Sequence, residues 1–503
     1  MSLELPDNRF LRLTTREQSR QLDENTITSF GIDSITLMEI AGQKAADLIR
    51  TQTKNGASGI YICGKGNNAG DALVAARYLT EQAGHSVTIL FASGNDNLSA
   101  DSQKNYQLLK KLADHGAPVT FLTDTQSIPW DRFDYAVDGM IGTGLTSDLR
   151  KPISDLAEKL NQSGLQTFSM DIPTGLNCDS GRMLGACVQA DHTITFGTNK
   201  IGFYLEDGPS VTGTITLADL PFPGYLRTHR AVLITKDLIK EFEGQPSEAA
   251  HKYEKGTVHI IAGSRGMTGA AIMAAKSAWN AGAGAVFLYS PKALLPVYEK
   301  TLPEIIKVPV GNEGDGHFTP ECTDTILNRI SDKKGVVLIG PGLGLDETTR
   351  QSVLGLLKSI DQPVILDADG LSVWEDTSDN GFDKSRWILT PHPGELKNYL
   401  GIDRLKNSDW MTTIEKLTHD QGCSLLSKGH PTVLATPGGG LYITGYDTRL
   451  FSKAGFGDVL AGTIAGKLAV SRITNQAITD ALISNFKAAE KHPDPQPSDI
   501  YDR

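Results

Sequence analysis

Short apolar runs alternate with longer segments of helical periodicity through the first 200 residues. Strands separated by helices in this way predict a parallel sheet with helices on both faces. Six runs have the length and composition of buried strands, at 59–63, 86–91, 119–122, 135–138, 166–171 and 192–196. Helical patterns cover 71–82, 102–113 and 153–162.

A second alternation predicts another α/β sheet in the second half. Its expected strands are 257–262, 285–289, 335–339, 363–367, 387–389 and 424–427, with helices over 269–281 and from Asp458 onward. Between the two alternations, Leu220-Pro221-Phe222-Pro223-Gly224 is typical of a linker or domain edge, and a charged helical segment follows at 236–242. We therefore expect two domains, 1–225 and 226–503. The proline-spaced tail after Lys491 is expected to be disordered.

Composition narrows the class of protein. The chain is 39% hydrophobic and 21% charged, values close to those of soluble globular proteins. Its net charge of −11 argues against a surface for nucleic acid or anionic membrane. The five cysteines are scattered without a C-x-x-C pair, and the N-terminus lacks a signal-peptide layout. We expect a cytoplasmic homo-oligomer with buried thiols that binds neither nucleic acid nor membrane.

Polar, glycine-containing segments follow three strands of the first half, at 64–71, 138–144 and 171–175. Ligands of parallel sheets bind at the carboxyl ends of strands, so these segments can converge on one pocket. The first segment, Gly-Lys-Gly-Asn-Asn-Ala-Gly-Asp, lies between a strand and a helix, where backbone N–H groups can hold phosphate. Such glycines often serve backbone geometry alone.

Oxygen-bearing side chains in these segments point to a cation or a bound ligand. Asn67 and Asn68 offer amide carbonyls, and Asp138 and Thr174 add a carboxylate and a hydroxyl. The alternative is that Asn68 caps the helix and Asp138 caps a turn. We favour the cation and ligand because three such loops coincide. Asp171 can transfer protons at the crevice, although an Asx-turn before Pro173 explains it equally well.

The second half carries its own polar strand ends. The segment 390–395 holds His392 between two prolines, which fix its backbone, although a lone histidine is more often structural. Asp458 begins a helix behind Gly455 and Gly457. A carboxylate beside a phosphate-binding helix start can serve as base to an attacking hydroxyl. A simple N-cap is the alternative, but it leaves the two glycines unexplained.

With these motifs placed, the whole chain resembles the bifunctional NAD(P)H-hydrate repair enzymes. The first half resembles the epimerase domain, whose Asn-Asn-Gly-Gly-Asp-Gly loop stands here as Asn-Asn-Ala-Gly-Asp-Ala at 67–72. The resemblance implies a Rossmann-like three-layer α/β sandwich with Asp171 as the acid/base. It implies K⁺ ligands at Asn68, Asp138 and Thr174. The implied substrate contacts are Asn67, Asn68, Ala69, Gly70, Asp71, Gly142, Thr143, Gly144, Leu145, Thr146, Ser147 and Asp148.

The second half resembles the ADP-dependent dehydratase domain, which is ribokinase-like and α/β. The resemblance implies Asp458 as the catalytic base and Mg²⁺ bound with ADP. It implies substrate contacts at Ala270, Gly344 and His392. The implied ADP contacts are Lys428, Gly429, His430, Pro431, Thr432 and Gly457.

The chain departs from the family pattern at several positions. Ala69 and Ala72 replace glycines, which is tolerable only if both keep a negative φ. Lys453, Ala454 and Phe456 stand where glycine or a small residue is common, and Phe456 could change how the adenine nucleotide sits.

The implied activity is repair of NADHX and NADPHX, the hydrated forms of NADH and NADPH. The first domain would interconvert the R and S epimers, and the second would dehydrate the S form at the expense of ADP. A ribokinase-like small-molecule kinase fused to a nucleotide-binding domain is the alternative, because it would use the same Gly457-Asp458 geometry. A non-catalytic nucleotide-binding protein would not need carboxylates beside both loops. A conventional NAD-dependent dehydrogenase is disfavoured because the first loop lacks the third glycine of the usual fingerprint.

Overall fold

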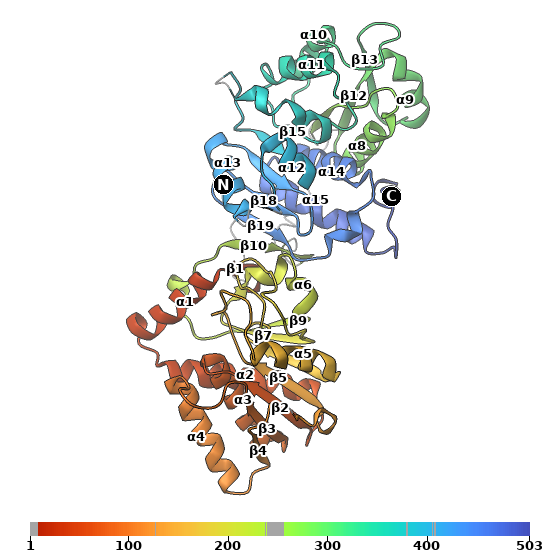
Figure 1. The fold of residues 1–503 in the computed structure, drawn as a ribbon. Helices are drawn as coiled ribbons and strands as arrows, with labels where there is room; N and C mark the ends of the chain where they lie inside the picture. The colour runs from red at the N-terminus through yellow and green to blue at the C-terminus, as the bar shows by residue number, and fades with distance from the viewer. Residues whose placement is uncertain are drawn as a thin grey trace. The chain divides into compact units, whose positions relative to one another are not determined.

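The computed structural model describes residues 9–502, except 126, 237, 239–255, 379–380, 405 and 407–408. The helix expected at 236–242 therefore lies almost wholly outside the described residues. The chain divides into two compact units, Asn8–Val232 and a second built from Leu233 onward. The division falls inside strand β10 (Ala231–Ile234). The two units run from red to yellow and from green to blue in Figure 1.

A parallel sheet of seven strands forms the centre of the N-terminal unit, in the order β4-β3-β2-β5-β6-β7-β9. Its strands are β2 (Ser58–Cys63), β3 (Ser86–Phe91), β4 (Val119–Leu122), β5 (Tyr135–Gly139), β6 (Gln166–Met170), β7 (His192–Phe196) and β9 (Thr214–Ala218). The surrounding helices are α2 (Ser34–Gln52), α3 (Asn67–Ala83), α4 (Ala100–Asp114) and α5 (Ile153–Ser163). Short elements complete it at β1 (Arg12–Thr14), α1 (Arg16–Asn25), β8 (Asn199–Lys200) and α6 (Gly208–Val211).

Both faces of this sheet are buried. Tyr61 packs with Leu73 of α3, whereas its neighbours Ile60 and Ile62 pack with Leu156 of α5. Successive residues of a strand point to opposite faces, so this alternation places helices on both sides and gives three layers. The strand order matches that of a doubly wound Rossmann-like fold and reverses between β2 and β5. The expected fold class is confirmed, and this reversal is where such folds bind ligands.

The segment 220–224 is part of the N-terminal unit rather than a free linker. Leu220 and Phe222 are buried in a cluster with Leu22 of α1 and Leu37 of α2. The prolines interrupt secondary structure, as the sequence indicates, but the apolar residues between them dock onto two helices. Of the two interpretations, a linker is wrong, because Leu220 and Phe222 are buried within the unit, whereas an edge of the domain agrees with its end nearby at Val232.

The C-terminal unit is also an α/β structure, whose sheet runs β13-β12-β11-β14-β15-β16-β17 in parallel and continues antiparallel through β18 and β19. The strands are β11 (Thr257–Ile261), β12 (Ala285–Pro291), β13 (Ile306–Val310), β14 (Val336–Ile339), β15 (Val364–Leu366), β16 (Trp387–Leu389), β17 (Ser424–Ser427), β18 (Val433–Ala435) and β19 (Leu441–Thr444). The helices are α8 (Thr268–Asn280), α9 (Leu295–Thr301), α10 (Thr323–Asp332), α11 (Glu347–Leu357), α12 (Pro393–Leu400), α13 (Trp410–Gln421), α14 (Phe456–Ser471), α15 (Thr474–Ala489) and α16 (Ser498–Tyr501).

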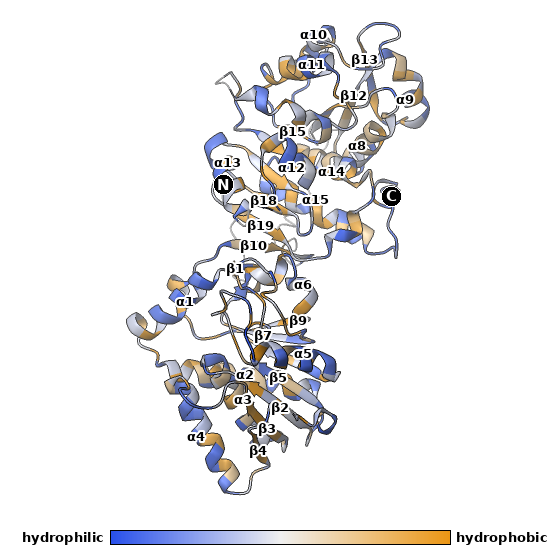
Figure 2. Ribbon diagram, in the orientation of Figure 1, coloured by the Kyte–Doolittle hydropathy of each residue, from blue (hydrophilic) through white to orange (hydrophobic). Residues whose placement is uncertain are grey.

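Helix α14 is the central helix of this unit and is apolar along most of its length (Figure 2). A helix that is hydrophobic on all sides is a buried one. Gly462 and Gly466 allow it to lie close against α8, because a Cβ at either position would fall within 2.4 Å of a carbonyl oxygen of Ala274 or Ala278. This close packing on α8 fixes the position of α14, whose first turn carries Asp458.

The tail after Lys491 is ordered, contrary to the expectation. Ile500 of α16 packs in a cluster with Phe456 and Val459 of α14. Asp502 pairs with Lys276 at 2.8 Å, and Asp494 pairs with Lys453. Composition alone predicts disorder for this proline-spaced segment, but the apolar docking of Ile500 provides the burial that orders it.

Two expectations from composition can be compared with the structure. All five cysteines are buried and free, as expected. Among the residues that the structure describes, no helix has both the length and the apolar character that a bilayer crossing requires.

Candidate active sites

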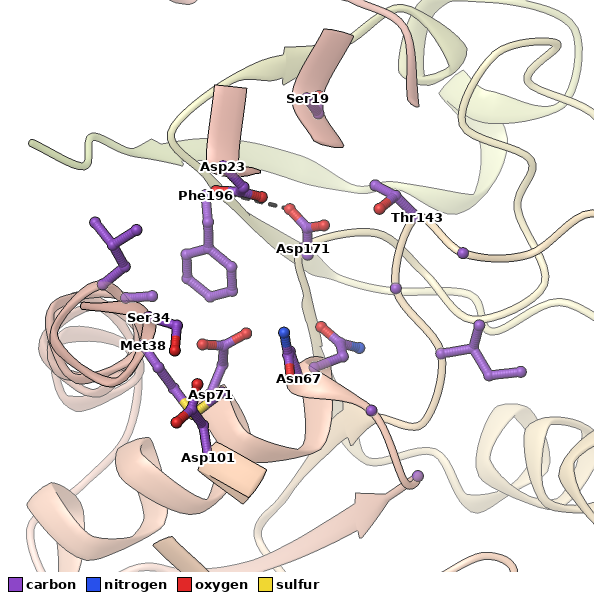
Figure 3. A pocket seen from close by; sticks show the side chains of 18 of the residues that line it. Ser19, Asp23, Ser34, Met38, Asn67, Asp71, Asp101, Thr143, Asp171 and Phe196 are labelled. Atoms are coloured by element: carbon purple, nitrogen blue, oxygen red, sulfur yellow. Dashed lines mark hydrogen bonds between the residues drawn. The ribbon is translucent and has the colours of Figure 1, made fainter. Parts of the chain in front are cut away.

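A cavity of about 610 Å³ opens at the point where the strand order of the N-terminal unit reverses. The first turn of α3 contributes Asn67, Asn68 and Asp71 to its lining, and Asp171 follows β6 (Figure 3). The loop after β5 contributes Gly142, Thr143 and Gly144. The structure therefore brings the three polar segments of the first half together, as their strand-end positions predict.

Six of the expected substrate contacts are not part of this lining. They are Ala69 and Gly70, inside α3, and Leu145, Thr146, Ser147 and Asp148, farther along the loop after β5. Helix α3 begins at Asn67 rather than Asp71, so Ala69 and Ala72 are helical and keep a negative φ, as their replacement of glycine requires.

Asp138 and Thr174 form one hydrogen-bonded group beneath the cavity. The Thr174 hydroxyl donates to Asp138 Oδ1 at 2.6 Å, while the Thr174 amide and Ser169 hydroxyl donate to Oδ2 at 2.8 and 2.9 Å. Burial raises the pKa of Asp138, and the hydrogen bonds from Thr174 oppose that rise. The Met140 amide also donates to Asp138, so its role in a turn is confirmed alongside the wider network.

The Asn68 side-chain amide lies against Gly142, where a Cβ would be 3.6 Å from Asn68 Oδ1, and the preceding Ile141 amide donates to the Thr174 hydroxyl. The Asn68 side chain is buried, and neither Oδ1 nor Nδ2 has a hydrogen-bond partner. It does not cap α3, because Gly66 is the N-cap residue. A buried polar group without a partner is costly, so an unfilled amide here indicates a site for an additional ligand. No group of three His, Cys, Asp or Glu side chains suited to a metal ion occurs among the described residues.

Asp171 is held by a buried lysine that sequence analysis missed. Lys200 Nζ lies 2.5 Å from Asp171 Oδ1, and the Lys200 side chain is only 2% exposed. The Phe196 amide donates to the same oxygen at 3.2 Å, shown by the dashed line in Figure 3. Asp171 has a φ of +61°, a strained backbone for a residue other than glycine. These contacts position the carboxylate more firmly than an Asx-turn would.

Two further carboxyl groups face the same cavity. Burial, followed by repulsion from Asp171 and Asp23, raises the pKa of Asp71 well above its usual range. Loss of hydration, followed by repulsion from Asp171, raises the pKa of Asp23 to about 6. Asp23 lies on α1, before the first predicted strand, and no local motif marks it. Lys200 also lacks a sequence signal, because it follows a short turn after β7.

The C-terminal unit has a cavity of about 730 Å³ at the carboxyl ends of its own strands. Its lining includes most of the expected dehydratase residues, namely His392, Lys428, Gly429, His430, Thr432, Gly457 and Asp458. Phe456 also lines it, packed edge-on against Phe451 with ring centroids 5.3 Å apart. Three expected residues, Ala270, Gly344 and Pro431, are not part of the lining.

Ala270 and Gly344 belong to an adjoining loop cluster. A Cβ at Gly342 would lie 3.0 Å from the Ala270 Cβ, so the start of α8 abuts the loop after β14. The Gly344 amide donates to Asp369 Oδ2 at 2.9 Å. Asp369 connects this cluster to the cavity, because Asp367, two residues earlier, lines the cavity.

Lys428 is the electrostatic centre of this cavity. Its Nζ lies 2.6 Å from Asp367 Oδ1 and 4.0 Å from Glu395 Oε2. Burial lowers the pKa of Lys428, but the neighbouring carboxylates of Asp367 and Glu395 reverse this effect and raise it. Sequence analysis assigned roles to neither Asp367 nor Glu395, although both follow expected strands.

Asp458 meets this network from the first turn of α14. Burial, with repulsion from Asp367 second, raises the pKa of Asp458 to about 7. A carboxyl with such a pKa exchanges protons readily near neutral pH. The lack of a side chain at Gly457 leaves room for Lys428 Nζ, because a Cβ at this position would lie only 3.3 Å from that atom.

His392 has a structural role at the start of helix α12, in addition to its place in the cavity lining. It is the N-cap of α12, and its Nδ1 accepts hydrogen bonds from the amides of Gly394 and Glu395 at 2.9 and 3.3 Å. The Glu395 carboxylate accepts from the His392 amide at 2.7 Å, which completes a capping box. Because Nδ1 accepts, a neutral ring carries its proton on Nε2, which lies 3.2 Å from Glu395 Oε1.

Comparison with known proteins gives matches across both units. Residues 34–202 match the family model described as YjeF-related protein N-terminus, and residues 258–497 match the model of NAD(P)H-hydrate dehydratase. Helix α1 and Asp23 precede the first matched segment.

Relatives cover nearly the whole chain. A bifunctional NAD(P)H-hydrate repair enzyme of Salinibacter ruber is 34% identical, over 93% of this chain and 90% of the relative. One from Moorella thermoacetica is 32% identical, over 90% and 87%. A solved ADP/ATP-dependent NAD(P)H-hydrate dehydratase from Bacillus subtilis, co-crystallised with ATP and Mg²⁺, is 26% identical. It covers 54% of this chain and 96% of its own, with a TM-score of 0.44.

Proposed function

Because the chain belongs to the family of bifunctional NAD(P)H-hydrate repair enzymes, we propose that it returns hydrated NAD(P)H to NAD(P)H in two steps. The N-terminal unit interconverts the R and S hydrates, and the C-terminal unit dehydrates the S form at the expense of ADP. The observation that carries the proposal is a separate cavity in each unit. Each cavity has an acidic residue available for proton transfer and a buried lysine paired with a carboxylate.

In the dehydratase step, Asp458 takes the proton of the C6 hydroxyl. The hydroxyl oxygen then attacks the terminal phosphorus of ADP, the bond from that phosphorus to the bridging oxygen breaks, and AMP leaves. The lone pair of the ring nitrogen expels the new phosphate from C6, and loss of a proton from C5 gives the C5–C6 double bond of NAD(P)H. Lys428 supports the transfer because its ammonium faces the start of α14, where phosphate charge can also be held by backbone amides.

Mg²⁺ fits the donor set of this cavity. Asp367 and Glu395 both line it with carboxylate oxygens, the ligands that Mg²⁺ prefers alongside nucleotide phosphate. These two residues would hold the ion, which when bound neutralises phosphate charge during transfer. The expected ADP contacts at Lys428, Gly429, His430, Thr432 and Gly457 surround the same space.

In the epimerase step, Asp171 serves as base and Asp71 as acid. Asp171 removes the C6 hydroxyl proton, a carbonyl forms at C6, and the C6–N1 bond breaks with its electron pair going to nitrogen. Asp71, whose raised pKa keeps it protonated, donates a proton to that nitrogen. Attack of the nitrogen on the opposite carbonyl face reverses both transfers and gives the other epimer. Lys200 holds the Asp171 carboxylate in place by direct pairing.

K⁺ fits the group formed by Asn68, Asp138 and Thr174. The unpartnered Asn68 amide supplies a neutral oxygen, and the Asp138–Thr174 pair supplies a carboxylate and a hydroxyl close to the same loop. Such a mixed oxygen set suits a weakly charged ion better than Zn²⁺, which prefers nitrogen and sulfur. Bound there, the ion would offset negative charge next to the reacting ring.

The test is incubation of the protein with mixed hydrate epimers, with and without ADP, while the absorbance of reduced nicotinamide is followed. Full recovery with ADP is expected, because epimerisation feeds the S form to the dehydratase. If the absorbance of reduced nicotinamide stops rising when the S form is consumed, the epimerase assignment is refuted. ADP consumption with a stable phosphorylated product would favour the small-molecule kinase. Homo-oligomer formation and a cytoplasmic location stay predictions.

A further inference from the structure

We propose that Asp23, contributed by helix α1, is a positioning residue of the epimerase centre whose negative charge keeps the proton on Asp71. The inference rests on the proposed epimerase function and extends it to a helix that precedes the segment matched by the family model. Asp23 takes no part in the proton transfers themselves. Its charge favours the protonated form of Asp71 with which the reaction starts.

Asp23 is placed at the epimerase cavity. It is an exposed residue of α1 that lines the same cavity as Asp71 and Asp171. In Figure 3, Asp23 and Asp171 point toward one another, and Asp71 lies across the cavity from them.

Helix α1 is held firmly in place. Ser19, one turn before Asp23 on the same helix face, shares buried hydrogen bonds of 2.9 Å with Thr14 and Thr198. Lys200 Nζ also donates a hydrogen bond to the Thr198 carbonyl oxygen at 3.0 Å. Leu22 is buried with Phe222 on the adjoining side. The helix is therefore fastened to the turn that positions Lys200, and Asp23 has a fixed place in the field of the site.

Carboxyl groups outnumber ammonium groups around this cavity. The groups facing Asp23 from other elements are Asp171 after β6, Lys200 of β8 and Asp71 of α3, while Asp101 of α4 faces Asp71. Two ammonium groups balance them in part, the buried Lys200 and Lys65, which also lines the cavity. Burial and repulsion from Asp171 are the largest causes of the raised pKa of Asp71. Repulsion from Asp23 adds to them and favours the protonated form, while Lys200 opposes the rise. Asp23 carries its charge above a pH of about 6.

The test is the pH profile of epimerisation in the full-length protein, measured with purified R hydrate, ADP and the chain's own dehydratase as reporter. Activity requires protonated Asp71, so it falls as pH rises through the pKa of Asp71. Asp23→Asn removes a repulsive charge and lowers that pKa. The alkaline limb should move down by about one pH unit, with the rate at low pH kept within about threefold. Asp23→Glu should return the limb to its original position.

The matched control is Glu24→Gln, which removes a charge from the next residue of the same helix. Glu24 is exposed and paired with Arg20, away from the cavity, so its profile should coincide with that of the unaltered protein. Dehydration of pure S hydrate checks that each variant is folded. An Asp23→Asn profile with an unmoved limb, or a uniform loss at every pH, would overturn the inference. An unaltered protein that does not accelerate epimerisation would instead refute the proposed function.

Discussion

Asp458 is the residue on which the dehydratase assignment depends most directly. Asp458→Asn keeps the size of the side chain but removes its basicity, so dehydration of S hydrate should fall by about 10²–10⁴-fold. Epimerisation should be unchanged. In the unaltered protein the base form predominates above a pKa of about 7, so the dehydration rate should rise with pH through that value. Stopped assays on pure S hydrate measure the loss of dehydration and its pH dependence. Near-normal turnover by the variant would exclude Asp458 as base.

Asn68→Ala gives a cleaner test of the proposed K⁺ site than Asp138→Ala. Asp138→Ala should lower epimerisation, but it also leaves buried donors of Thr174, Ser169 and Met140 without an acceptor. Each lost partner costs about 1–3 kcal/mol, so this variant is expected to be destabilised. Asn68→Ala breaks no hydrogen bond, because the amide has none.

We therefore expect Asn68→Ala to abolish the dependence of epimerisation on K⁺ while preserving the thermal midpoint measured in sodium. Thermal unfolding in matched potassium and sodium buffers provides a second measurement. The unaltered protein should gain stability in potassium, and the variant should not. Equal potassium responses in the two proteins would show that Asn68 does not hold the ion.

Among the secondary-structure elements, helix α3 and strand β5 pack closely where Ala72 faces Gly139. A Cβ at Gly139 would lie 2.8 Å from the Ala72 Cβ, so Gly139→Ala should destabilise the N-terminal unit by about 1–3 kcal/mol. Ala72→Gly should cost about 1 kcal/mol through helix propensity. The double variant should be less destabilised than the sum, because the shortened residue makes room for the added methyl.

Urea unfolding of the two single variants and the double variant measures this coupling. Gly224→Ala is the matched control, because a Cβ there meets nothing within 4 Å and its φ is not positive. Strict additivity of the two single effects would contradict the proposed contact. The same pair explains how α3 tolerates alanine at a position where the family motif has glycine.

At the scale of the whole molecule, each unit should fold and act alone. The division lies inside β10, whose Ala231 and Val232 pair with β1 while Ile234 accepts a hydrogen bond from Gly445. Overlapping fragments 1–234 and 231–503 each keep the whole strand and exceed 200 residues, which is enough for an independent core. We expect the first to epimerise and the second to dehydrate.

Circular dichroism and the two activity assays on the separate fragments check this expectation. Fragments 1–225 and 226–503 are the comparison. They place all of β10 in the C-terminal piece and leave β1 with only β8 of its two partner strands. We expect the shorter N-terminal fragment to be less stable. Insoluble or inactive products from every overlapping pair would contradict autonomous units.

Local patterns were sufficient to predict most of the central strands and the loops that follow them. The runs at 86–91 and 192–196 match β3 and β7 residue for residue, because strand periodicity and burial are properties of short segments. Asp171 and Asp458 were recognisable for the same reason, since each lies directly beside a strand or helix end. The parallel α/β class follows from the alternation of such elements.

Tertiary structure decided which charges meet. Lys200 is 29 residues from Asp171, and Lys428 is 61 residues from Asp367, yet each pair is in direct contact. Asp23 reaches the first site from a helix that no motif distinguishes. Packing also moved the start of α3 back to Asn67, against the weak helix propensity of an Asn-Asn pair. Periodicity is local to the chain, whereas an electrostatic interaction depends on distance through space, which the strand order and helix docking alone establish.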